Sequence, residues 1–268
     1  MNESIIAVFA HPDDETLVSG TLAMYAERGA RVTVLCATRG EVGQIAEGSG
    51  ATAETLGAFR EQELCDAMAI LGVKDVRFLD YRDSGMRGTP ENGDPRAFWK
   101  APADEVVAKI AATFADVRPT AVLTWDPTGG YGHPDHIAIH QHATAAFETY
   151  APAAGRPAAL FYALIPVGKF NRLRAELKER GINFEGPGDP DAIPKPDEML
   201  PANCVIDVSP YFDRKMDAFR AHRTQAQDFT TFADMPDDIR RRLFGRELYH
   251  RASPPVRDGV VYDRLIVS

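Results

Sequence analysis

The sequence predicts an α/β fold, a Rossmann-like three-layer sandwich built on a mostly parallel sheet. Short apolar runs rich in β-branched residues alternate with helix-like segments from the first residues onward, as they do in βαβ units. The chain has 268 residues, of which 44% are hydrophobic, and this length suits one large α/β domain. We therefore expect a single domain over residues 1–268. Residues 1–165 would form its Rossmann-like core, and residues 166–268 would complete the sheet and cover the crevice.

The predicted elements follow one another in a regular order. The apolar run IIAVFA at 5–10 predicts a strand, and the segment 16–27 behind it predicts a helix that Gly29 ends. A buried strand at 31–38 leads through a polar, glycine-rich stretch to a long helix that Gly72 ends. This long helix spans 55–71; the remaining strands are predicted at 76–81, 120–126, 159–165 and 204–209, and the remaining helices at 104–114 and 135–148.

The loops that follow these strands are the expected place for chemistry. Connections between parallel strands are almost always right-handed, so the strands can share one sheet with helices on both faces. Their carboxyl ends then meet at one edge, where open α/β sheets bind ligands. Two long irregular stretches, 82–103 and 186–203, are expected to form rims or lids of this crevice, because loops of such length are usually functional.

The composition excludes several classes of partner and site. With 39 acidic and 30 basic residues the net charge is −9, so nucleic acid is not expected to bind and the partner should be a small molecule. Cys36, Cys65 and Cys204 lack CxxC spacing, which argues against a thiolate zinc site, and each is expected to be buried. No basic segment precedes the first apolar run, and no stretch approaches the ~18 apolar residues of a membrane span. We expect a cytoplasmic protein whose oligomeric state is not readable from the sequence.

The segment His11-Pro12-Asp13-Asp14-Glu15 directly follows the first predicted strand. Pro12 fixes its own φ and biases His11 toward an extended conformation, so that the next side chains project at the sheet edge. His11 and Asp14 can converge on one cation while Asp13 points elsewhere, and three consecutive acids would repel one another without a positive partner. The alternative interpretation is structural, because an Asp before a helix commonly caps it.

A second segment repeats this architecture. The run TWDPTGGYGHPDH ends the fourth predicted strand and opens a helix with His133-Pro134-Asp135-His136. Two strand-end loops that both carry H-P-D are hard to explain by packing. His11 and Asp14 from the first loop and His136 from the second form a set of two histidines and one carboxylate, which suits Zn²⁺ or Fe²⁺. The spacing alone leaves open whether His133 is the ligand instead of His136.

Neighbouring residues have the properties that hydrolysis needs. A bound metal lowers the pKa of its water toward ~7, and Asp13 is placed to take the proton during attack on a carbonyl. The oxyanion that develops needs a donor besides the metal, and a protonated His133 or the Tyr131 hydroxyl can supply it. Asp135 can orient His133 and hold it charged.

The other histidines are weaker candidates. His140 shares a helix face with His136, but we interpret it and His142 as packed or solvated side chains. His222, in the segment FRAHRTQ, is expected to face the crevice, and His250 is expected at the surface.

The motifs resemble those of a known family. AHPDDE at 10–15 together with GGYGHPDH at 129–136 is similar to the PIG-L/LmbE-type zinc-dependent deacetylases, which remove the acetyl group from substrates that contain N-acetylglucosamine. The segments FREQEL (59–64), YRDSGM (81–86) and AHRTQ (221–225) also fall where that family has recurring segments. The details are most similar to the bacterial branch that contains the mycothiol-biosynthesis deacetylase and the mycothiol-conjugate amidase.

The resemblance implies an LmbE-like fold and a role for each matching residue. Segment 184–203 has no feature that matches the family. The implied zinc ligands are His11, Asp14 and His136, and the implied general base is Asp13. By the same resemblance His133 is the electrostatic stabiliser or general acid, with Asp135 as its partner, and Tyr131 approaches the oxyanion. Arg60 and Asp83 are implied to bind the sugar hydroxyls or an attached group.

Three hypotheses of function follow. The favoured one is a zinc-dependent hydrolase that removes the acetyl group from a small amino-sugar conjugate. The second is an amidase that cleaves a larger thiol conjugate, and assays of N-acetylglucosaminyl-inositol against its cysteinyl conjugate separate the two. The third is a non-catalytic sugar- or nucleotide-binding module. It is disfavoured because no strand leads into GxGxxG and the chain has no P-loop, and a metal assay tests it. A serine hydrolase is disfavoured because no GxSxG elbow occurs.

Overall fold

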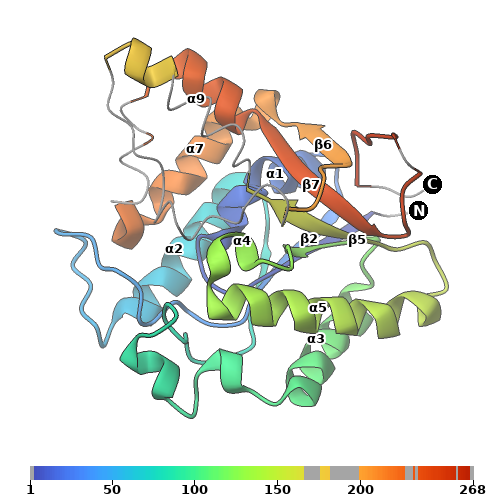
Figure 1. The fold of residues 1–268 in the computed structure, drawn as a ribbon, viewed down its shortest axis with the longest axis horizontal. Coiled ribbons are helices and arrows are strands. Elements are labelled where there is room, and N and C mark those ends of the chain that lie inside the picture. The colour runs from blue at the N-terminus through green and yellow to red at the C-terminus, as the bar shows by residue number, and fades with distance from the viewer. Residues whose placement is uncertain are drawn as a thin grey trace.

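One mixed sheet organises the protein, whose structure is a computed structural model. It describes residues 3–165, 176–181, 199–226, 232, 235–257 and 259–265. Within these residues, seven strands pair in the order β3-β2-β1-β4-β5-β7-β6 (Figure 1). The strands are β1 (Ser4–Phe9), β2 (Arg31–Cys36), β3 (Asp75–Phe78), β4 (Ala121–Trp125), β5 (Ala159–Leu164), β6 (Cys204–Asp207) and β7 (Arg246–Ser253).

The first five strands run parallel, with β1 in the middle. β1 pairs with β2 and β4, β2 with β3, and β4 with β5, all in parallel. Phe9 lies opposite Cys36 and Cys36 opposite Phe78, so β1, β2 and β3 end side by side. β7 is antiparallel to both of its neighbours, which leaves β6 pointing the same way as β5. The carboxyl ends of the parallel strands therefore share the edge at which open α/β sheets bind ligands.

Helices cover both faces of this sheet. On one face α3 packs against α5, and on the other α7 packs against α1 and α2 (Figure 1). Among the described residues no helix combines the length and the apolar character needed to cross a membrane. The helices named here are α1 (Ser19–Glu27), α2 (Leu56–Leu71), α3 (Ala103–Val117), α4 (Gly129–Gly132), α5 (Pro134–Ala153), α7 (Phe212–Ala221) and α9 (Asp237–Phe244).

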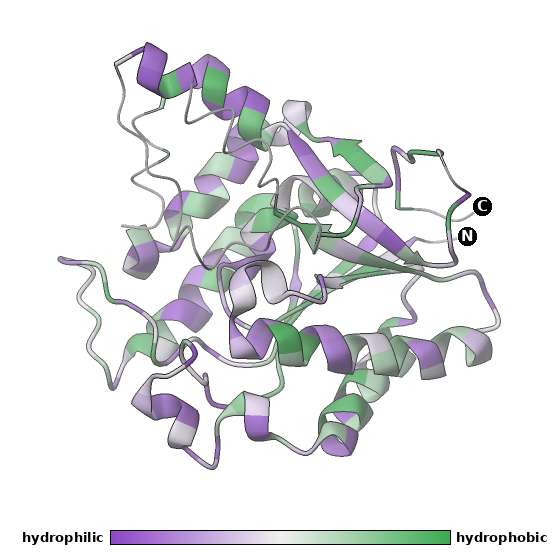
Figure 2. Cartoon of the chain, in the orientation of Figure 1, coloured by the Kyte–Doolittle hydropathy of each residue, from purple (hydrophilic) through white to green (hydrophobic). Residues whose placement is uncertain are grey.

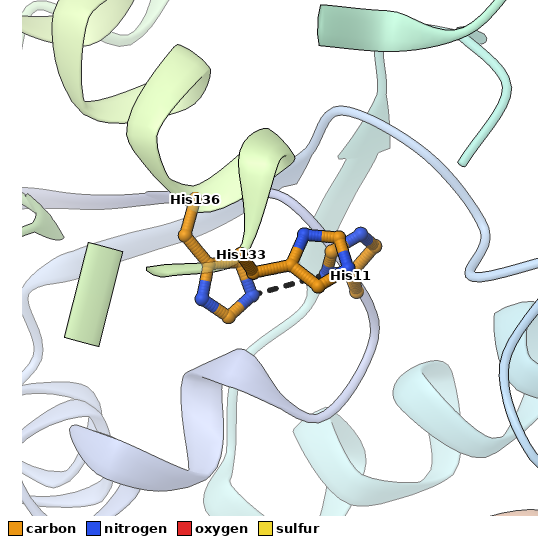
Figure 3. Close-up of side chains that lie close together, drawn as sticks. All are labelled: His11, His133 and His136. Carbon is orange, nitrogen blue, oxygen red and sulfur yellow. Dashed lines mark hydrogen bonds between the residues drawn. The ribbon is translucent and has the colours of Figure 1, made fainter. Parts of the chain in front are cut away.

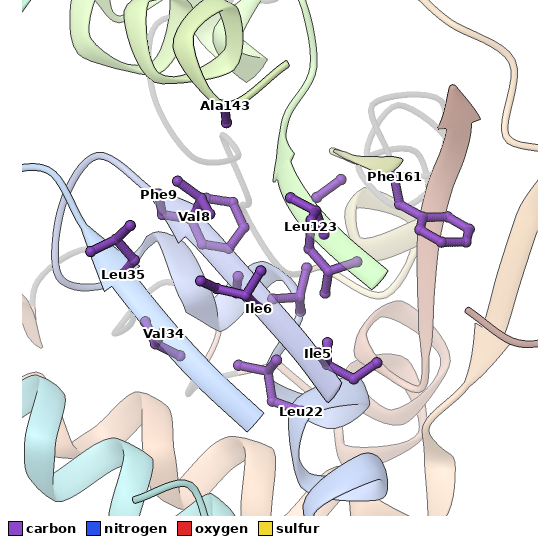
Figure 4. Packing of buried hydrophobic residues seen from close by; sticks show 14 of the residues in the cluster. Ile5, Ile6, Val8, Phe9, Leu22, Val34, Leu35, Leu123, Ala143 and Phe161 are labelled. Carbon is purple, nitrogen blue, oxygen red and sulfur yellow. The ribbon is translucent and has the colours of Figure 1, made fainter. Parts of the chain in front are cut away.

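The central strand β1 lies at the heart of the hydrophobic core. All six of its residues are buried, because helices shield both faces of a parallel sheet, and this explains its near-continuous apolar sequence. Figure 4 shows Leu22 of α1 and Ala143 of α5 on opposite sides of this strand. Hydropathy follows the same arrangement: the central strands are mostly hydrophobic, whereas β7 is largely hydrophilic (Figure 2). Each large side chain buried here contributes about 1.5–3 kcal/mol.

The predicted fold class is confirmed, and the predicted strands and helices are present with shifted ends. The helix expected at 16–27 begins instead as a 3-10 turn, Asp14–Leu17, followed by α1. The loop expected at 82–103 contains two further 3-10 turns, Pro90–Gly93 and Phe98–Lys100. The prediction that all three cysteines are buried is wrong for Cys65, which is exposed.

Among the described residues, β7, α7, α9 and the short helix α4 were not predicted from the sequence. The buried positions of β7 are Glu247, Tyr249 and Arg251, so polar side chains face the interior and the hydropathy pattern does not reveal the strand. The proline-rich stretch expected to form a lid at 186–203 lies outside the described residues as far as position 198.

Candidate active site

Loops from four neighbouring strands meet at the carboxyl edge of the sheet. They are His11–Glu15 after β1, 39–44 after β2, 82–84 after β3 and 129–136 after β4. The two H-P-D segments, more than a hundred positions apart in the sequence, lie side by side there. Figure 3 shows the rings of His11, His133 and His136 grouped together, and the ring centroids of His11 and His133 are 4.6 Å apart.

Asp14 is oriented by three hydrogen bonds to one of its oxygens. Oδ2 accepts from the backbone N–H groups of Ala10 and His11, each at 3.0 Å, and from the indole N–H of Trp125 at 2.9 Å. Oδ1 is left facing His136, with 3.1 Å between Oδ1 and Nε2. Burial opposes ionisation, but His136, His11 and the Trp125 N–H outweigh it and hold the pKa of Asp14 well below its ordinary value. The carboxylate thus presents one charged oxygen to the site.

His136 is fixed with its Nε2 atom toward Asp14. Its Nδ1 lies 3.0 Å from the carbonyl oxygen of Gly129. Because a carbonyl can only accept, Nδ1 carries a proton, and in the neutral ring Nε2 has a lone pair. The ring also stacks on Trp125, with centroids 4.2 Å apart and an interplanar angle of 12°. Gly129 adopts a φ of +64°, and a Cβ there would lie 2.8 Å from Cβ of His136, so this turn requires glycine.

His11 completes the cluster from the opposite side. Its Nε2 lies 3.2 Å from Oδ2 of Asp135 and 3.4 Å from Oδ1 of Asp83, so that nitrogen donates its proton to carboxylates. Burial opposes the charged form, but Asp83, Asp135 and Asp14 outweigh it and raise the pKa of His11 well above its ordinary value. Its Nδ1 faces His136, 3.2 Å from Nε2 of that ring (Figure 3).

The three donor atoms fit a small cation. Nδ1 of His11 lies 3.2 Å from Nε2 of His136, and Nε2 of His136 lies 3.1 Å from Oδ1 of Asp14. Two ligands of a tetrahedral ion at about 2.0–2.1 Å are about 3.3–3.5 Å apart, close to these separations. Either a proton in a hydrogen bond or a metal ion can lie between the two nitrogens, and the set of two imidazoles and one carboxylate suits a metal.

Other groupings of the same loops also bring ligand atoms together. Atoms of His11, His133 and His136 lie within 4.8 Å of one another, and so do atoms of His11, Asp83 and Asp135. In the second grouping both carboxylates face the Nε2 atom of His11, which carries a proton, so they orient the ring as carboxylates commonly do behind a metal-binding histidine.

Asp13 lies next to the cluster and is held in an uncommon conformation. Its φ of 107° is in the left-handed region, its backbone N–H donates to Oε2 of Glu15 at 2.9 Å, and its Oδ2 accepts from the side-chain amide of Gln225. Burial and the charge of Asp14 raise the pKa of Asp13 to about 7, against the opposing effect of Arg60.

The carboxylate of Asp135 faces His11 and Ser84 and not His133, the partner expected from the sequence. The backbone N–H of Ser84 donates to Oδ2 of Asp135 at 2.9 Å and the Ser84 hydroxyl donates to Oδ1. Asp135 reaches His133 through its backbone, whose N–H donates to Nδ1 of His133 at 3.1 Å and caps α5. Burial and the rings of His11 and His136 lower the pKa of His133 to about 2. A neutral His133 with Nδ1 accepting carries its proton on Nε2.

Arg60 lies under the glycine-containing loop after β2. The side chain is buried, and its Nη2 donates to the carbonyl oxygen of Gln44 at 3.2 Å. A Cβ on Gly40 would lie 2.5 Å, and one on Gly43 2.6 Å, from its Nη1, so a larger residue at either position would displace the guanidinium. Its buried Nε has no hydrogen-bond partner among the described residues.

Asp83 and Tyr131 occupy different depths of the site. Asp83 is buried, and its Oδ1 accepts from the Gly85 N–H at 2.8 Å. Burial opposes its ionisation, but His11 outweighs it and holds the pKa of Asp83 well below its ordinary value. Tyr131 is 38% exposed, and its ring meets His136 edge-on with centroids 5.0 Å apart, which places it at the rim.

Of the remaining histidines, His140, His142 and His222 are buried, and His250 is partly exposed. His140 donates through Nδ1 to the Trp125 carbonyl oxygen at 2.8 Å, and His142 packs edge-on against Phe98. His222, expected to face the crevice, has no exposed surface, and its Nε2 lies 2.7 Å from Oε1 of Glu15. A contact with Glu15 therefore replaces the direct substrate contact expected for His222.

Sequence reasoning missed four residues that shape the site: Glu15, Ser84, Trp125 and Gln225. Trp125 ends the strand predicted at 120–126 and was given no other role, although an indole beside a strand-end acid is a potential donor. Glu15 was treated only as one of three acids. Ser84 and Gln225 lie in segments that were noted, YRDSGM and AHRTQ, but only contacts across the fold reveal what they bind.

Comparison with solved structures shows the fold. The 4-carboxy-2-hydroxymuconate hydratase from Pseudomonas putida matches with a TM-score of 0.62 and 18% identity, over 97% of this chain and 100% of that one. The zinc-inhibited form of a teicoplanin deacetylase matches with a TM-score of 0.60 and 18% identity, over 94% of this chain and 99% of that one. Because one neighbour is a hydratase and the other a deacetylase, the shared fold does not identify the reaction.

Comparison of sequences is more specific. The 1D-myo-inositol 2-acetamido-2-deoxy-α-D-glucopyranoside deacetylase of Acidothermus cellulolyticus is 40% identical over 263 residues, with 93% of this chain and 88% of that protein covered. The family model PIG-L, described as GlcNAc-PI de-N-acetylase, matches residues 6–147, a range that includes both H-P-D segments. Since this match spans more than half of the 268 residues, the chain belongs to the PIG-L family.

Proposed function

We propose that this protein is a metal-dependent hydrolase that removes the N-acetyl group from a glucosamine-type conjugate, with an N-acetylglucosaminyl-inositol as the preferred substrate. The observation that carries the proposal is the convergence of Nδ1 of His11, Oδ1 of Asp14 and Nε2 of His136, each turned toward the others by a partner on its far side. The substrate class follows from the relative that is 40% identical, which is named for deacetylation of such a conjugate.

His11, Asp14 and His136 would hold the metal, and the nitrogen and carboxylate donors suit Zn²⁺ or Fe²⁺. When bound, such a cation supplies Lewis-acid chemistry: it polarises a carbonyl oxygen and makes water a stronger acid. Asp83 and Asp135 support this role by keeping the His11 proton on Nε2, which leaves Nδ1 as a ligand.

Asp13 is the proposed general base. Asp13 lies in the sequence between the proposed ligands His11 and Asp14, and its Oδ2 accepts a hydrogen bond from Gln225. Its carboxylate can therefore accept the proton of a water that attacks the amide carbonyl. The C–N bond then breaks, acetate forms, and the amine leaves with a proton returned to its nitrogen. A base whose pKa lies near neutrality suits both acceptance and return of that proton.

His133 and Tyr131 are the proposed donors to the oxyanion. With Nδ1 occupied by the Asp135 N–H, a neutral His133 offers its Nε2 proton as a hydrogen bond and does not need to be charged. Tyr131 approaches from the rim on a segment flanked by glycines. Donors already in place when charge develops stabilise a tetrahedral oxyanion most effectively.

Arg60 and Asp83 are the proposed contacts to the sugar. Both are buried at the carboxyl edge of the sheet, and the Arg60 Nε lacks a hydrogen-bond partner among the described residues. A guanidinium and a carboxylate together offer donors and acceptors for neighbouring sugar hydroxyls.

The Asp13→Asn variant tests the base. It should keep the wild-type metal content and lose about 10²–10⁴-fold in kcat, the usual contribution of a positioned base. Asp80→Asn is the matched control, because Asp80 is also an aspartate with a positive φ but is exposed and pairs with Arg39, and it should keep wild-type activity. A metal-loaded Asp13→Asn variant as active as the control would refute the base assignment.

The substrate and metal are tested by acetate release. Purified protein loaded with one equivalent of Zn²⁺ or Fe²⁺ should release acetate from N-acetylglucosaminyl-inositol faster than from free N-acetylglucosamine, and should not cleave the cysteinyl conjugate. The assay includes excess Zn²⁺ as a separate arm, because one structural neighbour is described as zinc-inhibited. Preferential cleavage of the cysteinyl conjugate would favour the amidase hypothesis. Absence of activity with every divalent metal tested would refute the proposal.

A further inference from the structure

Asp13 holds a backbone conformation that residues with a side chain rarely adopt. Its φ and ψ are 107° and −27°, and among the described residues only Asp13, Asp80 and Arg118 have a positive φ without being glycine. Such conformations persist only where the surrounding structure imposes them. The residue that acts as base in the proposed function therefore needs a device that holds its backbone.

Glu15 provides the first part of that device. Its Oε2 accepts the backbone N–H of Asp13 at 2.9 Å, and its Oε1 lies 2.7 Å from Nε2 of His222. Glu15 and His222 both have no exposed surface. With one oxygen engaged by His222, the carboxylate cannot rotate away from the Asp13 N–H without breaking a short buried hydrogen bond.

The second part is the segment 222–225, which follows α7. Besides His222, it contributes Gln225, whose amide donates to Oδ2 of Asp13. Thr224 anchors the segment to α2: its N–H and hydroxyl donate to the two oxygens of Glu63 at 2.9 and 2.6 Å. The same short segment thus reaches the backbone of Asp13 through Glu15 and its side chain directly.

We propose that Glu15 and His222 are positioning residues that act through Asp13: their buried hydrogen-bonded pair imposes the left-handed backbone of Asp13 and so aims its carboxylate into the site. The proposal rests on Asp13 being the base. His222 lies more than 200 positions from Asp13 in the sequence and does not touch the substrate, yet the proposal gives it a role in the reaction. Without the Glu15 acceptor, Asp13 would relax toward a negative φ and its carboxylate would turn away from the attacking water.

Variants of His222 separate positioning from simple stability. His222→Leu removes the donor to Glu15 and should lower kcat about 10- to 100-fold, the usual effect of a partner behind a reacting group. KM and metal content should change less than about twofold, because His222 contacts neither the substrate nor the proposed ligands. His222→Gln places an amide N–H near the position of Nε2 and should restore kcat to within about threefold of wild type.

A control with similar structural effects and no link to Asp13 is Tyr249→Phe. The Tyr249 hydroxyl lies within hydrogen-bond distance of the Thr21 hydroxyl and the Glu247 carboxylate, at a buried contact between β7 and α1, so its loss should lower Tm and leave kcat unchanged. Should His222→Leu not fold, Glu15→Gln serves instead, because it keeps the volume but offers one acceptor oxygen to two donors. A folded variant of either kind with wild-type kcat, or a His222→Gln variant as slow as His222→Leu, would overturn the proposal.

A double variant distinguishes this proposal from the proposed function. If Glu15 and His222 act through Asp13, adding His222→Leu to Asp13→Asn should lower kcat no further than Asp13→Asn alone. An active Asp13→Asn enzyme would instead refute the base assignment itself. If Asp13→Asn strongly reduces kcat and the double variant reduces it by a further tenfold or more, only the positioning role would be refuted.

Discussion

The indole N–H of Trp125 donates to Oδ2 of Asp14 at 2.9 Å, and the same ring stacks on His136 at 4.2 Å. One side chain at the end of β4 thus orients two of the three proposed metal ligands, which come from loops after different strands. The ring is 4% exposed, so its position is set by the core. The packing of Trp125 in the core therefore determines the geometry of two proposed metal ligands.

Replacing Trp125 by Phe should weaken metal binding while the fold is retained. Phe keeps an aromatic face for His136 but removes one of the three donors to Asp14, and loss of such a partner typically costs about 10–100-fold in metal affinity. Competition with a chelator of known affinity measures the change. Trp99→Phe is the control, because Trp99 is half-exposed and its Nε1 donates to the Asn92 carbonyl, away from Asp14. Equal metal affinities of the two variants would contradict the orienting role.

His136 and His133 should respond differently to the same substitution. His136→Ala removes a proposed ligand and should cost at least as much metal affinity as the ~100-fold upper range for a supporting residue. His133→Ala should keep its metal and lose acetate release, because the proposed role of His133 is donation to the oxyanion. Metal content by elemental analysis, paired with kcat, separates the two. Metal loss in His133→Ala with retention in His136→Ala would exchange their assignments.

Gly43→Ala should impair substrate binding without touching the metal. Gly43 contacts the guanidinium of Arg60 so closely that an added Cβ would lie 2.6 Å from Nη1, and buried Arg60 can make room only by moving. If Arg60 binds the sugar, KM should rise about tenfold, the equivalent of ~1.4 kcal/mol, with unchanged metal content. Gly93→Ala is the control, since nothing lies within 4 Å of a Cβ there. A KM equal to that of the control would place Arg60 outside the sugar site.

How much the sequence predicts depends on whether a contact is local. The strand that ends before His11 and the helix that begins at Pro134 are encoded by apolar runs and H-P-D turns, so their places at one sheet edge were predictable. The hydrogen bonds of His222 and Gln225 to Glu15 and Asp13 span more than 200 positions. No local pattern encodes such a pairing.

Buried polar residues account for most of what was missed. Strand β7 faces the interior with Glu247 and Arg251, and a pattern that equates burial with hydrophobicity passes over it. The same assumption placed His222 at the crevice, although it is buried against Glu15. A polar side chain can be buried where a partner satisfies it, and that partner is visible only in the folded chain.

Glu247 should be worth more to stability than the lysine it pairs with. Its carboxylate accepts from the N–H groups of Gly20 and Thr21 at 2.8 and 2.9 Å and from Lys215, and all of these contacts are buried. Glu247→Leu leaves the buried Lys215 ammonium without its carboxylate and should cost about 3–5 kcal/mol, a large share of the ~5–15 kcal/mol that stabilises a typical domain. Lys215→Met should cost less, because the carboxylate keeps its two N–H donors.

The double variant Glu247→Leu/Lys215→Met decides whether the uncompensated charge is the cause. Urea unfolding should show it to be more stable than Glu247→Leu alone, because replacing both members of a buried pair by apolar side chains removes the stranded ammonium. The recovery should be incomplete, since the N–H groups of Gly20 and Thr21 remain without their acceptor. If the double variant were no more stable than Glu247→Leu, the lost stability would belong to those backbone groups, and the pair with Lys215 would contribute little to joining α7 to β7.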